Sequence, residues 1–139
     1  MTVGCRCLVG GGLVAVAAMV AVVTGSAAQT MPHGRWLAED INGGGVIDRL
    51  QTTLDLSPEG RATGFGGCNA FTGQVRLEGA GVSFGPLAST RKACTPAVMD
   101  QEHKFHQALE AARSWRIDEH SKLILIDAAG KVVARLTRL

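Results

Sequence analysis

The residues of this chain that could support chemistry begin with a cysteine and an asparagine in a glycine-rich stretch, GFGGCNAFTGQV, residues 64–75. A cysteine such as Cys68 acts as a nucleophile when its thiol is reduced, has a lowered pKa and lies beside an imidazole. A histidine distant in the sequence would have to supply that imidazole. A local cysteine pattern does not transfer between families, however, and a second cysteine, Cys94, favours a disulfide in an exported chain. We therefore expect no catalytic residue and no enzymatic activity.

His103 and His106 follow Glu102 at a spacing that also occurs in metal-binding helices. The zinc-protease order is H-E-x-x-H, whereas the order here is E-H-x-x-H, and the sequence offers no third ligand. We therefore expect a solvent-facing helix surface at these histidines, with no metal and no other cofactor.

The glycines of residues 64–73 raise the separate question of a phosphate-binding loop. Such a loop lies between a strand and a helix, so that backbone N–H groups converge on the anion. Here the residues after the glycines alternate as in a strand, and no helical pattern begins before residue 95. Glycine inside a strand instead marks a bulge or the close approach of another segment. A disulfide at Cys68 would bring such a segment close.

The first 28 residues have the pattern of a secretory signal peptide. Arg6 precedes an apolar run over residues 8–23, and small residues follow up to Ala28, after which we expect cleavage. An uncleaved membrane anchor is the alternative, although the run is shorter than the ~20 residues of a spanning helix. We predict a signal peptide over 1–28, a short linker over 29–35, one domain over 36–139, and a periplasmic or secreted location.

The composition of the expected mature chain excludes some classes of partner. Without Arg6, 13 basic residues face 12 acidic ones, so the net charge falls from +2 to +1. A surface this close to neutral, with few aromatic side chains, does not favour nucleic-acid binding. Of the four cysteines, Cys68 and Cys94 remain after cleavage. An even pair in an exported domain is expected to form a disulfide, worth roughly 3–4 kcal/mol on the loop-entropy account.

Hydrophobic periodicity indicates strands before and after one helix. We expect an α+β fold with a mostly antiparallel, strongly curved sheet, and we expect both tryptophans and all four phenylalanines in its core. Thr95 and Pro96 are typical of a helix start, and a stripe including Glu102 and Phe105 faces inward. Strands are expected over residues 35–43, 49–56, 61–79 (one long strand or a hairpin), 82–94, 122–127 and 131–139, and the helix over 95–115, with Arg113 at its end.

Several of these motifs together resemble the META domain family, which includes the heat-shock-associated protein HslJ. The family's G-C-N-x-aromatic-x-G signature is matched by Gly67, Cys68, Asn69, Phe71 and Gly73; its T-R-x-x-C element by Thr90, Arg91 and Cys94; its helix pattern by Glu102, Phe105 and Leu109. The resemblance implies a compact, mostly antiparallel β-domain with one helix, found in bacterial envelope or secreted proteins. It implies a loose link to stress response and no established enzymatic activity.

The T-R element also leads to an expected ion pair. Glu102 lies on the inward stripe of the helix, and a buried carboxylate needs partners to stay charged. We predict that Arg91 pairs with Glu102 near the start of the helix.

The function that we expect is a non-enzymatic envelope domain, monomeric, which binds a protein or peptide partner at an exposed sheet edge. The alternative is a small-ligand binder that uses the concave face of the sheet. An enzyme based on Cys68 or the histidines ranks third. The membrane is contacted only through the signal segment, if that segment is retained.

Overall fold

The computed structural model of the chain describes residue 4, residues 10–12, residue 21 and residues 30–139. The predicted signal peptide and its cleavage after Ala28 fall almost entirely outside these residues. Within the described residues, no helix has both the length and the apolar character needed to cross a membrane.

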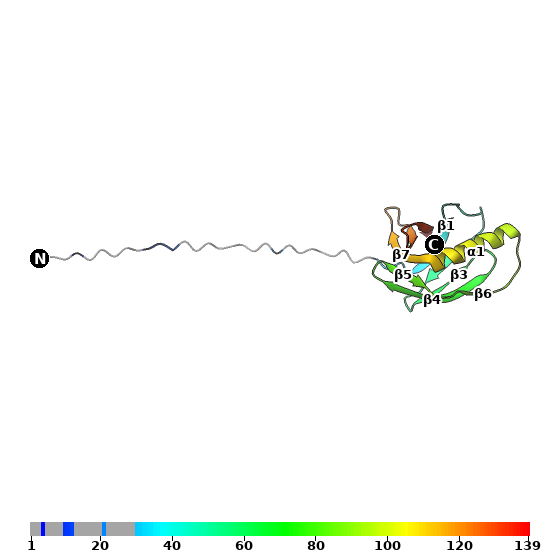
Figure 1. Cartoon of the computed structure of the whole chain (residues 1–139), viewed down its shortest axis with the longest axis horizontal. Coiled ribbons are helices and arrows are strands. Elements are labelled where there is room, and N and C mark those ends of the chain that lie inside the picture. The colour runs from blue at the N-terminus through cyan, green and yellow to red at the C-terminus, as the bar shows by residue number, and fades with distance from the viewer. Residues whose placement is uncertain (1–3, 5–9, 13–20, 22–29) are drawn as a thin grey trace.

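Residues 34–138 form nine strands and a helix, which follow one another along the chain in the order given below (Figure 1). They are β1 (Gly34–Ile41), β2 (Thr53–Leu56), β3 (Arg61–Phe65), β4 (Ala70–Glu78), β5 (Gly81–Phe84), β6 (Ala88–Ser89), α1 (Pro96–Ala111), β7 (Ala112–Ile117), β8 (Leu123–Asp127) and β9 (Val132–Arg138). Strand β1 begins at Gly34, within the segment that was expected to be a linker.

Eight of the strands close into an antiparallel barrel. The strand order is β3-β2-β1-β9-β8-β7-β5-β4-β6, and an additional pairing of β3 with β4 closes the ring. Strand β6 lies outside the ring, attached to β4 alone. The prediction of an antiparallel α+β fold is confirmed, but a strongly curved sheet understates the curvature, because the sheet meets itself.

The glycine-rich hairpin of β3 and β4 shows why glycine is required at the closure. A Cβ atom built on Gly64 would lie 2.1 Å from the carbonyl oxygen of Thr53 and 2.7 Å from the ring of Phe71. Neighbouring segments therefore approach the backbone of β3 more closely than any side chain permits. The prediction that these glycines mark a close approach is confirmed.

Apolar side chains fill the interior of the barrel. The core contains Trp36, Leu54, Leu125, Leu136 and further residues from each strand of the ring and from α1. Both tryptophans and three phenylalanines are buried, but Phe65 is 39% exposed, so the prediction that it belongs to the core is wrong. Side chains of a strand alternate between faces, and Ala62, at 0% exposure, takes the inward face of β3, which leaves Phe65 on the outward face.

Helix α1 lies across the barrel at the end where β3 turns into β4 (Figure 1). Its inner face buries Phe105 and Leu109 completely. The helix begins at Pro96 after Thr95, as predicted, although the side chain of Thr95 makes no capping hydrogen bond.

Three predicted boundaries are wrong. The helix ends at Ala111, and residues 112–117 form β7, in which Trp115 pairs with Leu125 of β8. The strand expected from residue 49 begins at Thr53, and the strand expected over 82–94 is interrupted at 85–87, where Pro86 has no N–H to donate. Pairing with other strands decides the first two of these boundaries, and local periodicity does not reveal that pairing.

Candidate functional site

The most elaborate polar arrangement of the described residues is centred on Glu102 of α1, whose side chain is buried beneath the β3–β4 turn. Its carboxylate accepts hydrogen bonds from the backbone N–H of Cys68 (2.9 Å) and of Asn69 (2.6 Å), and from the Asn69 side-chain amide (2.8 Å). A Cβ on Gly66 would lie 2.6 Å from Cγ of Glu102, so the turn needs glycine to reach this carboxylate. Burial raises the pKa of Glu102, but the hydrogen bonds from Asn69 and Cys68 outweigh it, and the pKa lies below its ordinary value.

The predicted ion pair between Arg91 and Glu102 does not form. Arg91 is exposed, and no ion pair among residues 30–139 includes it. The buried carboxylate is satisfied by two backbone N–H groups and one amide instead, and hydrogen bonds of this kind favour the charged form as a cation would. The prediction is therefore wrong in the partner, although Glu102 does lie on the inward stripe.

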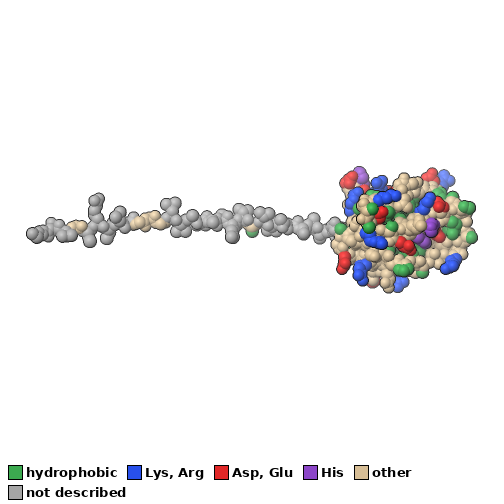
Figure 2. Space-filling model, viewed as in Figure 1, with side chains coloured by type: hydrophobic (Ala, Val, Ile, Leu, Met, Phe, Trp, Pro, Cys, Tyr) green, Lys and Arg blue, Asp and Glu red, His purple; other side chains and the backbone are tan. Residues whose placement is uncertain are grey.

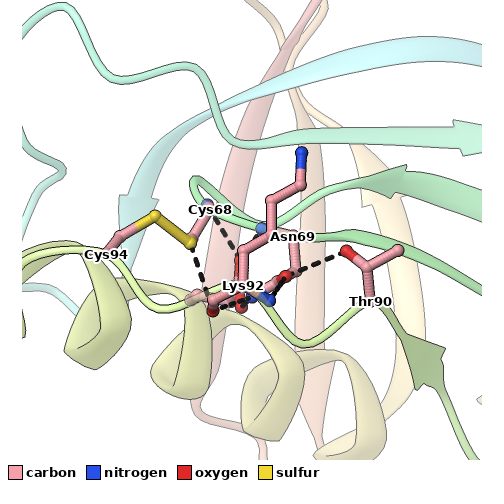
Figure 3. Close-up of a disulfide and its surroundings, with 6 residues drawn as sticks. Cys68, Asn69, Thr90, Lys92 and Cys94 are labelled. Carbon is pink, nitrogen blue, oxygen red and sulfur yellow. Dashed lines mark hydrogen bonds between the residues drawn. A yellow bond between two sulfur atoms is a disulfide. The ribbon is translucent and has the colours of Figure 1, made fainter.

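The side chain of Asn69 also holds the segment that leads into the helix (Figure 3). Its Oδ1 accepts hydrogen bonds from the backbone N–H of Lys92 (2.6 Å) and from the hydroxyl of Thr90 (2.9 Å). Its Nδ2 donates to the carbonyl oxygen of Lys92 at 3.2 Å. The amide thus pairs with both backbone groups of Lys92, as a residue of a neighbouring strand would do.

The predicted disulfide is confirmed: Cys68 is bonded to Cys94, 26 positions along the chain (Figure 3). Cys68 is buried and Cys94 is exposed, so the bond joins the base of the β3–β4 turn to the surface just before α1. The sulfur of Cys68 lies 3.5 Å from the carbonyl oxygen of Lys92, a contact without a proton to share. A bonded sulfur lacks the thiol that a nucleophile requires.

Residues 88–93, which we call the edge segment, lie beside the start of β4 and the turn that precedes it. Each of them is exposed, so neither face of this segment packs into the core. Ser89 pairs with Phe71, and the N–H of Thr90 donates to the carbonyl of Ala70 at 3.0 Å. Since backbone groups alternate in direction along an antiparallel strand, the N–H and C=O groups of Ser89 and Arg91 point away from β4.

Four further family-motif positions have structural roles. Phe71 and Phe105 are buried and meet edge to face at 6.1 Å between ring centroids. A Cβ on Gly73 would lie 2.7 Å from Leu87, so this glycine lets residues 85–87 cross β4. Gly67 has a φ of 124°, a conformation that other residues rarely adopt.

The two histidines differ in environment. His103 is exposed, as predicted, but His106 is half-buried, and its ring lies edge to face against Phe71 at 5.1 Å. Its Nε2 is buried and has no hydrogen-bond partner. Burial lowers the pKa of His106, although the charges of Glu102 and Glu110 act in the opposite direction. The prediction of a solvent-facing surface is therefore wrong for His106, which follows Phe105 at the border of the buried stripe.

No group of three potential metal ligands occurs in the part of the chain that the structure describes. The face shown in Figure 2 carries acidic and basic side chains interspersed, with histidines among them.

Sequence reasoning missed a second buried polar connection, between Gln101 and Thr52. Gln101 Nε2 donates to the Thr52 hydroxyl (3.0 Å), which donates to the carbonyl of Gly66 (3.0 Å), while Gln101 Oε1 accepts from the N–H of Ile47 (2.7 Å). Gln101 is 7% exposed and Thr52 is 0% exposed. The signal in the sequence was the position of Gln101 next to Glu102 on the helix. Gln101 bonds to the segment before β2, at Ile47 and Thr52, whereas Glu102 bonds to the β3–β4 turn.

Comparison with known proteins places the chain in context. A family model described as META domain matches residues 29–138. Two solved structures are similar in fold. An NMR structure of a protein from Burkholderia xenovorans has 25% identity and a TM-score of 0.62, and the match covers 76% of this chain and 81% of that one. A second NMR structure has 23% identity and a TM-score of 0.55, covering 74% of this chain and 87% of the other. A search of curated proteins found no match.

Proposed function

Since the chain belongs to the META domain family, we propose that it is a non-enzymatic, exported interaction module of the cell envelope. It binds an extended segment of a partner protein at the edge segment, residues 88–93. We extend the proposal to a role in stress response, on the ground of the family resemblance alone.

The observation that carries the proposal is the open, preorganised edge of β6. Strand β6 ends the sheet, and the outward backbone groups of Ser89 and Arg91 are available to another strand. Closed barrels otherwise remove their edges, which makes an appended edge strand a distinct feature of this fold. The Asn69 amide fixes the segment at Lys92 and the Cys68–Cys94 bond fixes the chain just after it, so a partner strand would not need to order the segment first.

The two alternatives have less support. The concave face of the sheet, where a small ligand would bind, is the barrel interior and is filled by apolar side chains. The sulfur of Cys68 is part of a disulfide, and His106 packs against Phe71 without a hydrogen-bond partner for Nε2.

Proline at position 89 tests strand addition, because it removes the outward N–H of Ser89 and leaves the bonds to β4 in place. A photocrosslinking residue at Ala93 in the full chain should capture a partner in wild type and in the matched control Ser89→Ala. In Ser89→Pro we expect a loss of about three- to tenfold, the effect of one hydrogen bond of about 1 kcal/mol.

The same crosslinker at exposed Lys131, on the β8–β9 turn, serves as the positional control. Equal capture by Ser89→Pro, at unchanged melting temperature, would contradict strand addition, as would equal capture from position 131.

Export is tested separately by the mass of the protein recovered from the envelope fraction. We expect a mature chain that begins at Gln29, as the small residues before it predict. An intact chain found only in the cytoplasmic fraction would contradict the proposed location.

A further inference from the structure

The charge of the edge segment indicates which chemistry its partner carries. Arg91 and Lys92 lie within this segment, and no acidic residue occurs between positions 88 and 99. The first acidic residue after it, Asp100, is engaged by Lys104 at 2.6 Å. None of the ion pairs found among residues 30–139 includes Arg91 or Lys92. The edge segment is therefore positively charged and uncompensated.

The two cations follow β6, which ends at Ser89. Thr90 bonds to Ala70 and Lys92 bonds to the Asn69 side chain, so backbone groups alternate beyond β6 as they do in a strand, and the side chains of Arg91 and Lys92 therefore take opposite faces. A strand that adds beside the edge segment would meet one cation on each of its faces. Opposite charges at cross-strand positions attract, and like charges repel.

Two more basic residues lie on the outward face of the neighbouring hairpin. Arg61 of β3 and Arg76 of β4 line an open groove of about 1180 Å³, and no ion pair among the described residues includes either of them. Thr72, which pairs with Ala88 of β6, lines the same groove. Glu59 lines the same groove, so the groove carries both signs of charge, and the net charge of residues 30–139 is close to zero.

We infer that the partner segment is an acidic extended peptide, with neighbouring carboxylates that meet Arg91 and Lys92 from the two faces of the added strand. This inference rests on the proposed function, since it assumes that the partner binds along β6. The outward backbone groups of Ser89 can bond to an extended segment of any sequence, so they do not distinguish one partner from another. The charge of the edge segment supplies that selectivity.

The test uses three fluorescent peptides of equal length in which valine alternates with pairs of glutamate, glutamine or lysine. Binding to the protein with its disulfide intact is followed by fluorescence anisotropy. We expect the glutamate peptide to bind more tightly than the glutamine peptide and the lysine peptide to bind most weakly. Raising the salt from about 50 to about 300 mM should reduce the difference, because exposed charges are screened.

Variants separate the contribution of charge from that of the edge. Arg91→Gln/Lys92→Gln should weaken binding of the glutamate peptide by about two- to thirtyfold and leave the glutamine peptide unchanged. The matched control, Lys131→Gln/Arg135→Gln, removes the same charge from exposed positions on β9 and its turn and should have no effect. Ser89→Pro should weaken both peptides.

The possible failures are distinguishable. If the glutamine peptide binds as tightly as the glutamate peptide and Ser89→Pro weakens both, the acidic partner is refuted while strand addition stands. If the glutamate peptide binds but Ser89→Pro has no effect, strand addition itself is refuted, and binding is electrostatic alone. Absence of binding by all three peptides would refute both.

Discussion

Replacing the buried side chain of Asn69 by alanine should strongly destabilise the protein. The side chain makes four hydrogen bonds, two through Oδ1 and two through Nδ2, with lengths between 2.6 and 3.2 Å. Three of them involve neutral groups of Thr90 and Lys92, each worth about 0.5–1.5 kcal/mol, and the bond to the carboxylate of Glu102 is worth about 1.5–3 kcal/mol. Partial access of water to Lys92 reduces the sum, so we expect a loss of about 3–4 kcal/mol in the free energy of unfolding.

The assay is urea unfolding of the disulfide-bonded protein, with thermal unfolding as a second measure. A loss of this size corresponds to a decrease of about 10–20 °C in Tm for a domain of this length. The matched control is Gln74→Ala, an exposed amide on β4, which should change stability by no more than about 0.5 kcal/mol. Amide hydrogen exchange should accelerate at residues 90–93 first. If Asn69→Ala and Gln74→Ala unfold at the same urea concentration, the hydrogen bonds of the Asn69 side chain do not stabilise the fold.

Three other predictions follow from the same contacts. The pKa of Glu102 in the folded protein lies below its ordinary value of 4.5, so the charged carboxylate stabilises the fold above that pH, and this stabilisation is lost as the pH falls through the folded pKa. Glu102→Gln should be less stable at neutral pH, and its stability should depend less on pH in the acid range. Equal pH dependence of stability in the variant and the wild type would contradict this. Reduction of the disulfide should lower the free energy of unfolding of the wild type by roughly 3–4 kcal/mol, and the Cys68→Ala/Cys94→Ala variant should not respond to the reductant. An equal loss of stability in the wild type and the variant would show that the reductant does not act through this disulfide. Gly64→Ala should lower the free energy of unfolding by about 1–3 kcal/mol or prevent folding, because its Cβ would lie 2.1 Å from a backbone oxygen. Gly44→Ala is the control, since its Cβ would lie 3.5 Å from the nearest backbone oxygen and should be tolerated.

Local signals in the sequence were sufficient for the helix start and the final hairpin. Thr95 and Pro96 mark where α1 begins, and Gly130 marks the turn between β8 and β9, because a few neighbouring residues determine such features. The pairing of Cys68 with Cys94 was predicted from the expected export of the protein and from the number of cysteines, since the expected mature chain has no other cysteine.

Non-local pairing accounts for what could not be predicted. The closure of the barrel depends on β3 pairing with both β2 and β4, which no periodicity within β3 reveals. The partner of Glu102 was wrongly predicted because charge complementarity points to Arg91, whereas the donors are mostly backbone N–H groups, which every residue except proline carries. Phe65 was misplaced because its hydrophobicity indicates burial, while the register of its strand places it outside.

The place of Asn69 in the fold explains why an edge is left open beside a closed barrel. Strand β4 begins at Ala70, so no strand residue lies opposite Lys92, and the Asn69 amide takes that position. An amide can accept two hydrogen bonds and donate two, and all four are used here. Aspartate would lose both donors and would place a second carboxylate beside Glu102, which the lowered pKa of Glu102 shows to be charged at neutral pH.

The Asn69 side chain continues the hydrogen bonding of the edge segment past the start of β4, and among the described residues no strand pairs with the outer side of β6. Cys68 and Asn69 of the family signature therefore both hold the proposed binding edge in place. Cys68 is bonded to Cys94, just after the edge segment, and Asn69 binds the backbone of Lys92 within it.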